Sequence, residues 1–299
     1  MTLNRTKHIN GKAITLFGFN MKKKGKNRTL YKAIDESALV YKKMATVIYE
    51  HYLSILDNPI SSNENNALSR AIKDIPHAFF KGRSPITNAQ AHIGFDLTIT
   101  IDIKDFFGSI TDSMLASHFS SDVLDACFID GTLPQGLATS PVISNIAMIG
   151  MDQKIYTYLS QYTSVIHQES SLRTLLNQIS KTHNENEAEK NTFAYTRYAD
   201  DISISINLRK DADARTQSTA IIKSISALLA ESGFKVNTKK TKVMLDTGGY
   251  RIITGVAVNK HKIKATRKTI RLIRASMHNA NLCKAEGLLN WADQIKRAM

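Results

Sequence analysis

Two adjacent aspartates at a predicted turn constrain the fold of this chain more than any other feature. Asp200 and Asp201 follow residues 193–198, which have strand composition, and precede residues 202–206, in which isoleucine alternates with serine. That alternation has the period of a half-buried strand, so the pattern predicts a hairpin. Because adjacent carboxylates repel each other, divalent cations are the expected partners if the turn faces a cleft. The alternative is a solvated turn.

A third carboxylate is predicted where another strand leaves the core. In residues 97–103, leucine and isoleucine occupy the odd positions, while threonine and Asp102 occupy the even positions. Asp102 therefore faces away from the apolar side of the strand. If the two strands share a sheet, Asp102, Asp200 and Asp201 supply oxygen ligands for two Mg²⁺ ions about 3.5 to 4 Å apart.

A loop between these two elements carries further candidate residues. Residues 133–141 read Leu-Pro-Gln-Gly-Leu-Ala-Thr-Ser-Pro and precede an apolar helical pattern. Gly136 allows a backbone to approach a ligand closely, and the Gln135 amide can contact a base or a sugar. An ordinary loop that enters a helix is the alternative.

The order of these motifs resembles the palm of a reverse transcriptase. Asp102 with Phe107 comes first, then residues 135–141, then residues 198–201, and residues 233–242 resemble the next palm motif. The resemblance extends from about residue 17 to about residue 279. It implies an α+β, right-hand polymerase fold with fingers over 1–95, a palm over 96–258 and a small helical thumb over 259–299. The polar stretch 161–191 looks like an insertion, expected to be either a surface excursion or a docking site.

The resemblance also implies roles for individual residues. Asp102, Asp200 and Asp201 would be catalytic, and the main-chain carbonyl of Ile103 would join them around two Mg²⁺ ions, with Asp201 either a ligand or a structural carboxylate. Phe107 would lie under the incoming sugar and favour dNTPs by excluding a 2′-hydroxyl. In the basic stretch 22–30, Arg28 is the best match for a triphosphate contact, and the accompanying lysine is ambiguous among four. The expected nucleotide-binding residues are Arg28, Lys26, Phe107, Gln135, Gly136 and Tyr198.

Two short stretches narrow the resemblance to bacterial retron reverse transcriptases. Residues 88–92, Asn-Ala-Gln-Ala-His, resemble an asparagine-alanine-x-x-histidine element, and residues 253–255 resemble a valine-threonine-glycine triplet with Ile in place of Val. A retron enzyme is expected to copy a cognate structured noncoding RNA from the 2′-hydroxyl of an internal guanosine into branched RNA–DNA. A nearby effector protein, a possible higher-order complex and a role in antiphage defence belong to the same expectation. The expected RNA-binding residues are Asn88, His92, Thr254, Gly255, Lys264, Arg267, Lys268, Arg271 and Arg274. For Asn88 and His92, a local capping and packing role is the alternative.

The charge distribution favours a nucleic-acid partner. The chain carries a net charge of +14, yet residues 1–28 hold eight Lys or Arg and no acid, and residues 239–274 hold eleven with one acid. The net charges of these two segments, +8 and +10, add up to more than the net charge of the whole chain, so the rest of the chain is slightly acidic. Two basic segments on either side of a near-neutral region indicate a channel for a phosphate backbone, with solvated surface charge as the alternative.

Composition excludes some classes of protein and leaves two rivals. Hydrophobic residues make up 42% of the 299 positions, which suffices for a substantial core. No apolar run is long enough to span a bilayer and no secretory pattern opens the chain, so a cytoplasmic location is expected. The rivals are a reverse transcriptase of another bacterial lineage and a nucleic-acid-binding antitoxin or scaffold with a polymerase fold. Intact Asp102, Asp200, Asp201 and Gln135 favour an active enzyme.

Overall fold

An antiparallel sheet lies at the centre of the computed structural model, which describes residues 3–9, 11–23, 26–57, 66–178, 193–208 and 213–298. The strand order is β5-β6-β4-β7, and β8 also pairs with β4. These strands are β4 (Leu97–Lys104), β5 (Phe193–Tyr198), β6 (Asp201–Ile206), β7 (Lys235–Val236) and β8 (Lys242–Leu245). Strand β4 is central because the alternation of residues 97–103 gives it one wholly apolar face, which the structure buries.

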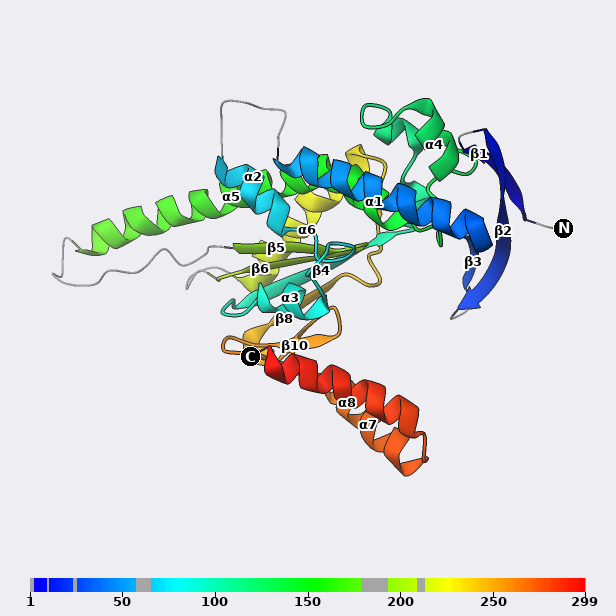
Figure 1. Ribbon diagram of the computed structural model, residues 1–299. Helices are drawn as coiled ribbons and strands as arrows, with labels where there is room; N and C mark the ends of the chain where they lie inside the picture. Colours follow the sequence, from blue (N-terminus) through cyan, green and yellow to red (C-terminus); the bar gives the residue numbers. More distant parts are fainter. Residues whose placement is uncertain are drawn as a thin grey trace.

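Helices cover that apolar face of the sheet (Figure 1). The core joins the odd-numbered β4 side chains to apolar residues of α5 and α6, and α1 and α2 complete the layer. The helices are α1 (Asp35–Asp57), α2 (Asn66–Asp74), α5 (Ser140–Gln178) and α6 (Ala214–Glu231). Short elements between β4 and α5 add to this core, namely η1 (Phe107–Ser109), η2 (Asp112–Leu115) and α4 (Ser121–Cys127).

Part of the predicted insertion is helical. Helix α5 continues to Gln178, so residues 161–178 extend the helix that begins at Ser140. The remainder of the stretch, residues 179–192, lies outside the described residues. Its expected role as a docking site stays a prediction.

The N-terminal residues form a separate three-stranded sheet at one end of the molecule (Figure 1). It consists of β1 (Arg5–Ile9), β2 (Lys12–Lys23) and β3 (Lys26–Lys32). Ile14 and Leu16 pack with Tyr41 of α1 in a second apolar cluster, which attaches this sheet to the helical layer. The far end of the β2–β3 hairpin carries the basic stretch, including Arg28, which is exposed.

The C-terminal part lies on the other face of the central sheet. Strands β9 (Arg251–Ile253), β10 (Val256–Val258) and β11 (Ile263–Ala265) form a small sheet that packs on α3 (Pro85–Gln90), and η3 (Asp246–Gly248) precedes it. Because β11 pairs with β10, the boundary expected at residue 258 falls inside this sheet.

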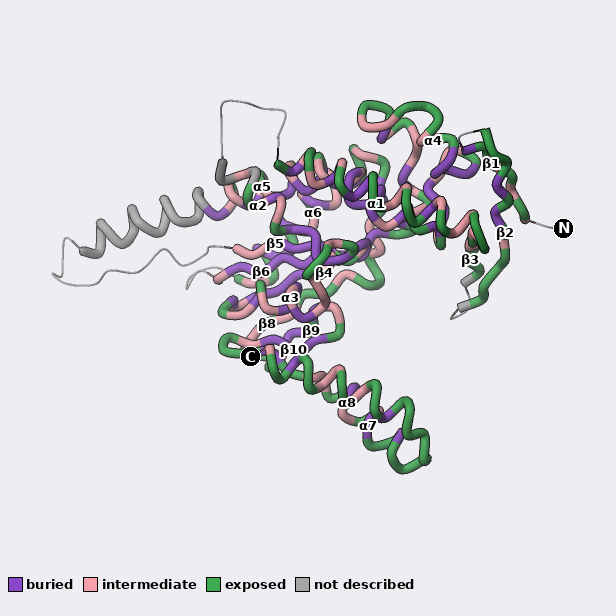
Figure 2. Tube along the Cα trace, viewed as in Figure 1, coloured by how far each residue is buried: buried purple, intermediate pink, exposed green. Residues whose placement is uncertain are grey.

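Two helices end the described chain, α7 (Arg267–His278) and α8 (Leu282–Arg297). Most of their surface is exposed (Figure 2). The buried face of α7 holds Thr269, Ile273 and Ser276, whereas Met277 is 56% exposed. Across the described residues, no helix combines the length and apolarity needed to cross a bilayer.

Candidate active site

The predicted hairpin is confirmed. Strands β5 and β6 pair so that Tyr198 lies opposite Asp201, which leaves Ala199 and Asp200 as a two-residue turn. Ala199 adopts a left-handed φ of 57°, a conformation that a short hairpin turn needs and that most non-glycine residues avoid.

Strand β4 brings the third carboxylate to the same place. Asp102 lies opposite Asp201 in the β4–β6 ladder, and the Ile103 N–H donates to the Asp200 carbonyl oxygen at 2.9 Å. Opposite residues in such a ladder have their Cβ atoms within about 5.5 Å of each other. The structure therefore gathers three aspartates, distant in sequence, where two central strands end.

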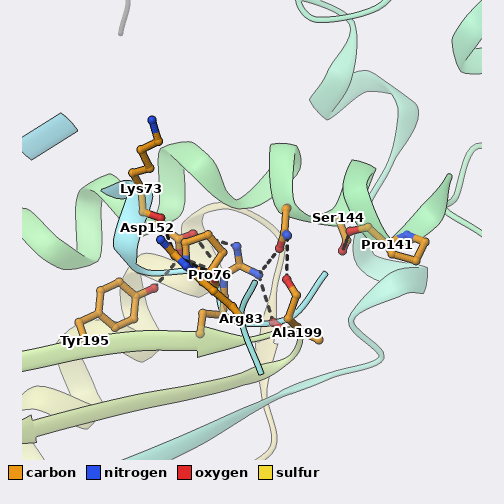
Figure 3. A network of polar contacts seen from close by, with 11 residues as sticks. Lys73, Pro76, Arg83, Pro141, Ser144, Asp152, Tyr195 and Ala199 are labelled. Atoms are coloured by element: carbon orange, nitrogen blue, oxygen red, sulfur yellow. Dashed lines mark hydrogen bonds and ion pairs between the residues drawn. The ribbon is translucent and has the colours of Figure 1, made fainter. Parts of the chain in front are cut away.

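A buried ion pair supports the turn (Figure 3). Arg197 has no exposed surface, and its Nη2 lies 2.9 Å from Oδ2 of Asp152 on α5. Its Nη1 donates to the Ala199 carbonyl at 3.3 Å and to Oδ1 of Asn145 at 3.2 Å. The Tyr195 hydroxyl donates to the same Asp152 carboxylate at 2.6 Å. The guanidinium thus fixes the carbonyl of the strained turn residue.

Sequence reasoning overlooked Arg197 and Asp152, although a signal was present. Arg197 lies opposite Ile202, and Tyr195 lies opposite Ile204, so both are on the core-facing side of β5. A charged residue at an apolar-face position predicts a buried partner of opposite charge, because an unpaired buried charge is costly.

Residues 233–242 contribute two polar partners to Asp102. The Asn237 side-chain N–H donates to Asp102 Oδ1 at 2.8 Å, and Lys240 Nζ lies 2.5 Å from Oδ2. The Asn237 backbone N–H also donates to the Asp102 carbonyl at 2.8 Å. This stretch resembled a palm motif in sequence, but the contacts of these two side chains were not predicted.

The remaining carboxylates have raised pKa values. Burial is the main reason that the pKa of Asp200 lies above its ordinary range, with the charge of Asp102 adding to it. For Asp201, burial and the charges of Asp200 and Asp102 raise the pKa to about 6. A group of carboxylates that oppose each other's ionisation would bind a cation favourably.

The donor chemistry at this site fits Mg²⁺. Carboxylate and carbonyl oxygens are the ligands that this hard cation prefers, and repulsion among the aspartates indicates a deficit of positive charge. Among the described residues, no three His, Cys, Asp or Glu side chains already lie close enough together to hold a metal ion. The Lys240 ammonium already offsets the charge of Asp102.

A cavity of about 750 Å³ opens on one side of the carboxylates. Asp102 and Asp200 line it together with Arg28, Phe107 and Gln135 from three other segments. These three are nucleotide-binding candidates that the structure brings together. The side chain of Lys26, another candidate, lies outside the described residues.

Gly136 packs closely against the N-terminal sheet. Its φ is 106°, and a Cβ at this position would overlap the Tyr31 carbonyl oxygen. The neighbouring Gln135 carbonyl accepts from the Tyr31 N–H at 2.8 Å. Gly136 therefore permits the close approach of β3, which attaches the N-terminal sheet to the loop that leads into α5. Its expected nucleotide contact stays a prediction.

A second cavity, of about 510 Å³, adjoins the same carboxylates. Asp102, Asp200 and Lys240 line both cavities. The second one is completed by other residues: Pro85, Thr100, Ile101, Tyr198, Asp201, Ser203, Lys242, Ile252, Thr254 and Gly255. Tyr198, expected in the nucleotide site, therefore lies in this cavity instead.

The two retron-like stretches meet beside the second cavity. Thr254 and Gly255 form the turn between β9 and β10, with φ values of 44° and 83°. Asn88 on α3 donates from Nδ2 to the Thr254 hydroxyl oxygen at 3.2 Å. Asn88 and His92 have no exposed surface. Their expected direct contact with RNA is therefore wrong, because neither side chain can reach a ligand without local unfolding.

The basic residues of the C-terminal part lie on an exposed surface. Arg267, Arg271 and Arg274 line, with Lys264, a third cavity of about 590 Å³ between α7, α8 and β11. Lys264 Nζ lies 3.5 Å from the centre of the Tyr250 ring, and Lys268 is exposed outside this cavity. Their contact with RNA stays a prediction.

Comparison with known proteins identifies a family of nucleic-acid polymerases, in agreement with the three gathered aspartates. A family model described as reverse transcriptase (RNA-dependent DNA polymerase) matches residues 22–273. The retron Mx162 reverse transcriptase of Myxococcus xanthus is 27% identical over 71% of this chain and 46% of its own length. The retron Ec86 and Ec73 reverse transcriptases of Escherichia coli are 28% and 30% identical, over 67% and 65% of this chain and 54% and 58% of theirs.

The chain spans about half the length of these curated relatives. Among solved structures, the apo telomerase from Candida tropicalis is similar with a TM-score of 0.48 and 10% identity, over 83% of this chain and 48% of that one. That similarity is too low to support an argument. The family model covers most of the chain, and the α+β architecture is the expected right-hand polymerase fold. The chain belongs to the reverse transcriptase (RNA-dependent DNA polymerase) family.

Proposed function

We propose that this protein is an RNA-directed DNA polymerase that adds deoxynucleotides to a primer strand paired with an RNA template. The observation that carries the proposal is the position of Asp102, Asp200 and Asp201 between two cavities, one of which Arg28 also lines. The N-terminal sheet and α1–α3 serve as fingers, the central sheet with its helices and the β9–β11 sheet as palm, and α7–α8 as thumb.

The two cavities suit the geometry of phosphoryl transfer. The reaction brings an attacking primer hydroxyl and a triphosphate to the same metal-binding carboxylates, so it needs room for both beside them. We assign the incoming dNTP to the first cavity, where Arg28 meets the triphosphate, Phe107 lies against the sugar and Gln135 contacts the base or sugar. The primer end, with its attacking hydroxyl, occupies the second cavity beside Tyr198 and the 254–255 turn.

Asp102, Asp200, Asp201 and the Ile103 carbonyl would hold two Mg²⁺ ions. When bound, these ions lower the pKa of the primer hydroxyl and neutralise the triphosphate and the leaving pyrophosphate. The chain itself positions the three carboxylates through the β4–β6 register and through Asn237 and Lys240, which orient the Asp102 side chain.

We further propose that the enzyme belongs to a retron. Its similarity to retron reverse transcriptases supports this, as does the contact between the two retron-like stretches. The enzyme would copy a cognate structured noncoding RNA from an internal guanosine 2′-hydroxyl and act with an effector protein encoded nearby in antiphage defence. Thr254 and Gly255 would contact the RNA at the second cavity. The thumb would grip duplex phosphates through Lys264, Arg267, Lys268, Arg271 and Arg274.

Nucleic acid that co-purifies with the protein from its native locus tests this proposal. On a denaturing gel, we expect a DNA species whose mobility shifts after ribonuclease and again after a 2′,5′-debranching enzyme. DNA without a branch would remove the retron assignment and leave the polymerase one. The Asp200→Asn variant is expected to abolish DNA synthesis while RNA binding persists, and substantial residual synthesis would overturn the catalytic assignment.

A further inference from the structure

The turn at residues 254–255 is attached to α3 through one hydroxyl group. The Thr254 hydroxyl donates to the Pro85 carbonyl at 3.2 Å. A hydroxyl has a single proton, so the same oxygen can only accept from Asn88 Nδ2. Thr254 thus uses both hydrogen-bonding functions of its hydroxyl to bind one helix. Apolar packing of Ile86 against Ile253 and Val256 surrounds this contact.

A second attachment lies at the base of the same hairpin, where β9 begins. Arg251, which has no exposed surface, donates from Nη1 to the Thr98 hydroxyl at 2.8 Å. Thr98 contacts the Ser205 hydroxyl at 2.7 Å, and Ser205 contacts His92 Nδ1 at 2.8 Å. His92 Nε2 lies 2.7 Å from the Thr196 hydroxyl. One continuous chain of polar groups therefore joins β9, β4, β6, β5 and the turn after α3.

The direction of these hydrogen bonds follows from the arginine. A guanidinium only donates, so Thr98 accepts from Arg251 and directs its own proton to Ser205. Ser205 then donates to His92 Nδ1, and His92 Nε2–H donates to Thr196. The opposite direction would leave the buried Thr98 proton without a partner in this chain of contacts, which is costly. A neutral His92 agrees with its burial, which, together with the charge of Arg251, lowers its pKa to about 3.

The chain from Arg251 reaches strands that carry the active site. Thr98 and Ser205 lie on β4 and β6, the strands that bear Asp102 and Asp201. The 254–255 turn, which Thr254 attaches to α3, lines the second cavity together with those aspartates. Hydrogen bonds between buried polar groups favour one arrangement of the elements that carry them.

We propose that Asn88 and His92 are positioning residues that hold the 254–255 turn at a set position relative to the catalytic strands. Asn88 and His92 do not contact nucleic acid themselves. The turn that they hold contacts the terminal nucleotide of the primer strand in the second cavity. This inference rests on the proposed polymerase function. It replaces RNA recognition as the reason for the 88–92 element.

Primer extension kinetics on an RNA template test the proposal. Asn88→Ala removes the donor to Thr254, whereas Thr254→Val removes both that bond and the bond to the Pro85 carbonyl. We expect Asn88→Ala to raise the KM for primer–template about fivefold, as the loss of one hydrogen bond predicts, and Thr254→Val to raise it at least as much, with the KM for dNTP changed less than about twofold. The double variant should show about the same rise as Thr254→Val alone, because that variant already lacks the bond that Asn88→Ala removes. A multiplicative rise, or an equal rise in the KM for dNTP, would overturn the proposal.

A matched variant separates positioning from general destabilisation. Ile225→Val trims a buried side chain of α6 and leaves every polar contact of the assembly in place. We expect it to leave the KM for primer–template at the wild-type value. If it raised that KM as much as Asn88→Ala does, the effect would be one of stability and the proposal would fail.

Amide hydrogen exchange measures the attachment without relying on catalysis. Peptides covering residues 250–258 should exchange faster in Asn88→Ala and in Thr98→Val, which interrupts the chain between Arg251 and Ser205, than in Ile225→Val. Unchanged exchange in both would overturn the proposal. If the wild-type protein extended no primer at all, the proposed function would fall, and exchange alone would decide whether these residues hold the turn.

Discussion

The two hairpin turns beside the second cavity are built alike but anchored differently. The 199–200 turn and the 254–255 turn each contain a non-glycine residue with positive φ, and a fully buried arginine supports each one. Arg197 meets the Asp152 carboxylate, whereas the hydrogen bonds of Arg251 go to a hydroxyl and to the His92 carbonyl.

The difference is visible in the pKa values of the two guanidinium groups. Burial opposes the charge of both. At Arg197 the Asp152 carboxylate outweighs burial and the pKa rises above its usual value, whereas at Arg251 burial prevails over the more distant Asp246 and Asp96, and the pKa falls. The 199–200 turn is held by an ion pair in which Asp152 neutralises the buried Arg197. The 254–255 turn is held by Arg251, whose hydrogen-bond partners are uncharged. The first anchor should therefore be the more sensitive to loss of one partner.

Breaking the ion pair is expected to have the largest effect. Asp152→Ala leaves Arg197 buried without its counter-charge, and we expect unfolding free energy to fall by about 3–5 kcal/mol in urea denaturation. Replacing both partners, as in Asp152→Leu with Arg197→Met, should recover much of that loss. Equal stability of the single and double variants would contradict the compensated-pair account.

Removing the other arginine is expected to cost less. Arg251→Met loses hydrogen bonds from a charged donor, worth about 1.5–3 kcal/mol each, but it also relieves the burial of a charge that has no carboxylate in contact. We expect the net loss in urea denaturation to be below about 3 kcal/mol and smaller than that of Asp152→Ala. A larger loss would reverse the ranking of the two anchors.

Acid should destabilise the folded protein partly through His92, alongside His77, whose pKa burial also lowers. Below pH 6.5 the unfolded chain protonates His92, while the folded chain keeps it neutral down to about pH 3. Unfolding therefore takes up a proton in this window, so stability falls as the pH falls, by about 1.4 kcal/mol per pH unit. Above pH 6.5 the effect is absent. Urea denaturation of wild type and His92→Gln at several pH values should show a shallower slope in the variant, and parallel slopes would exclude His92 as the cause.

Relief of backbone strain is expected to have the smallest effect. Ala199→Gly removes the penalty of a left-handed alanine, of about 1–2 kcal/mol, but raises the entropy of the unfolded chain. We expect thermal unfolding to show a gain of at most about 1 kcal/mol. A clear loss of stability would mean that packing of the alanine methyl group contributes more free energy than the backbone strain costs.

Local patterns were sufficient for the secondary structure around the carboxylates. The alternation of residues 97–103 and 202–206 predicted the faces of β4 and β6, and the 198–201 turn was recognisable from its flanks. The order of motifs predicted the reverse transcriptase family and the right-hand fold, both of which are confirmed. Arg28, Phe107 and Gln135 were predicted to share a site, and they line one cavity.

The same patterns misassigned residues whose partners lie far away in the chain. Asn88 and His92 were interpreted as RNA contacts, yet both are buried and bond to residues more than 100 positions away. Asn237 and Lys240 gained a role only when β7 and the segment after it came to lie beside β4.

The amino-acid sequence by itself determined the faces of β4 and β6, the 199–200 turn, the family and the basic segments, because these depend on motifs, periodicity and composition within short stretches. The tertiary structure alone decided which polar side chains are buried and with whom they pair. That outcome depends on how α3 and the 254–255 turn dock on the central sheet, since a hydrogen bond requires its partner within about 3 Å and no local pattern encodes that distance. The Arg197–Asp152 pair and the chain of contacts from Arg251 to His92 are both of this kind.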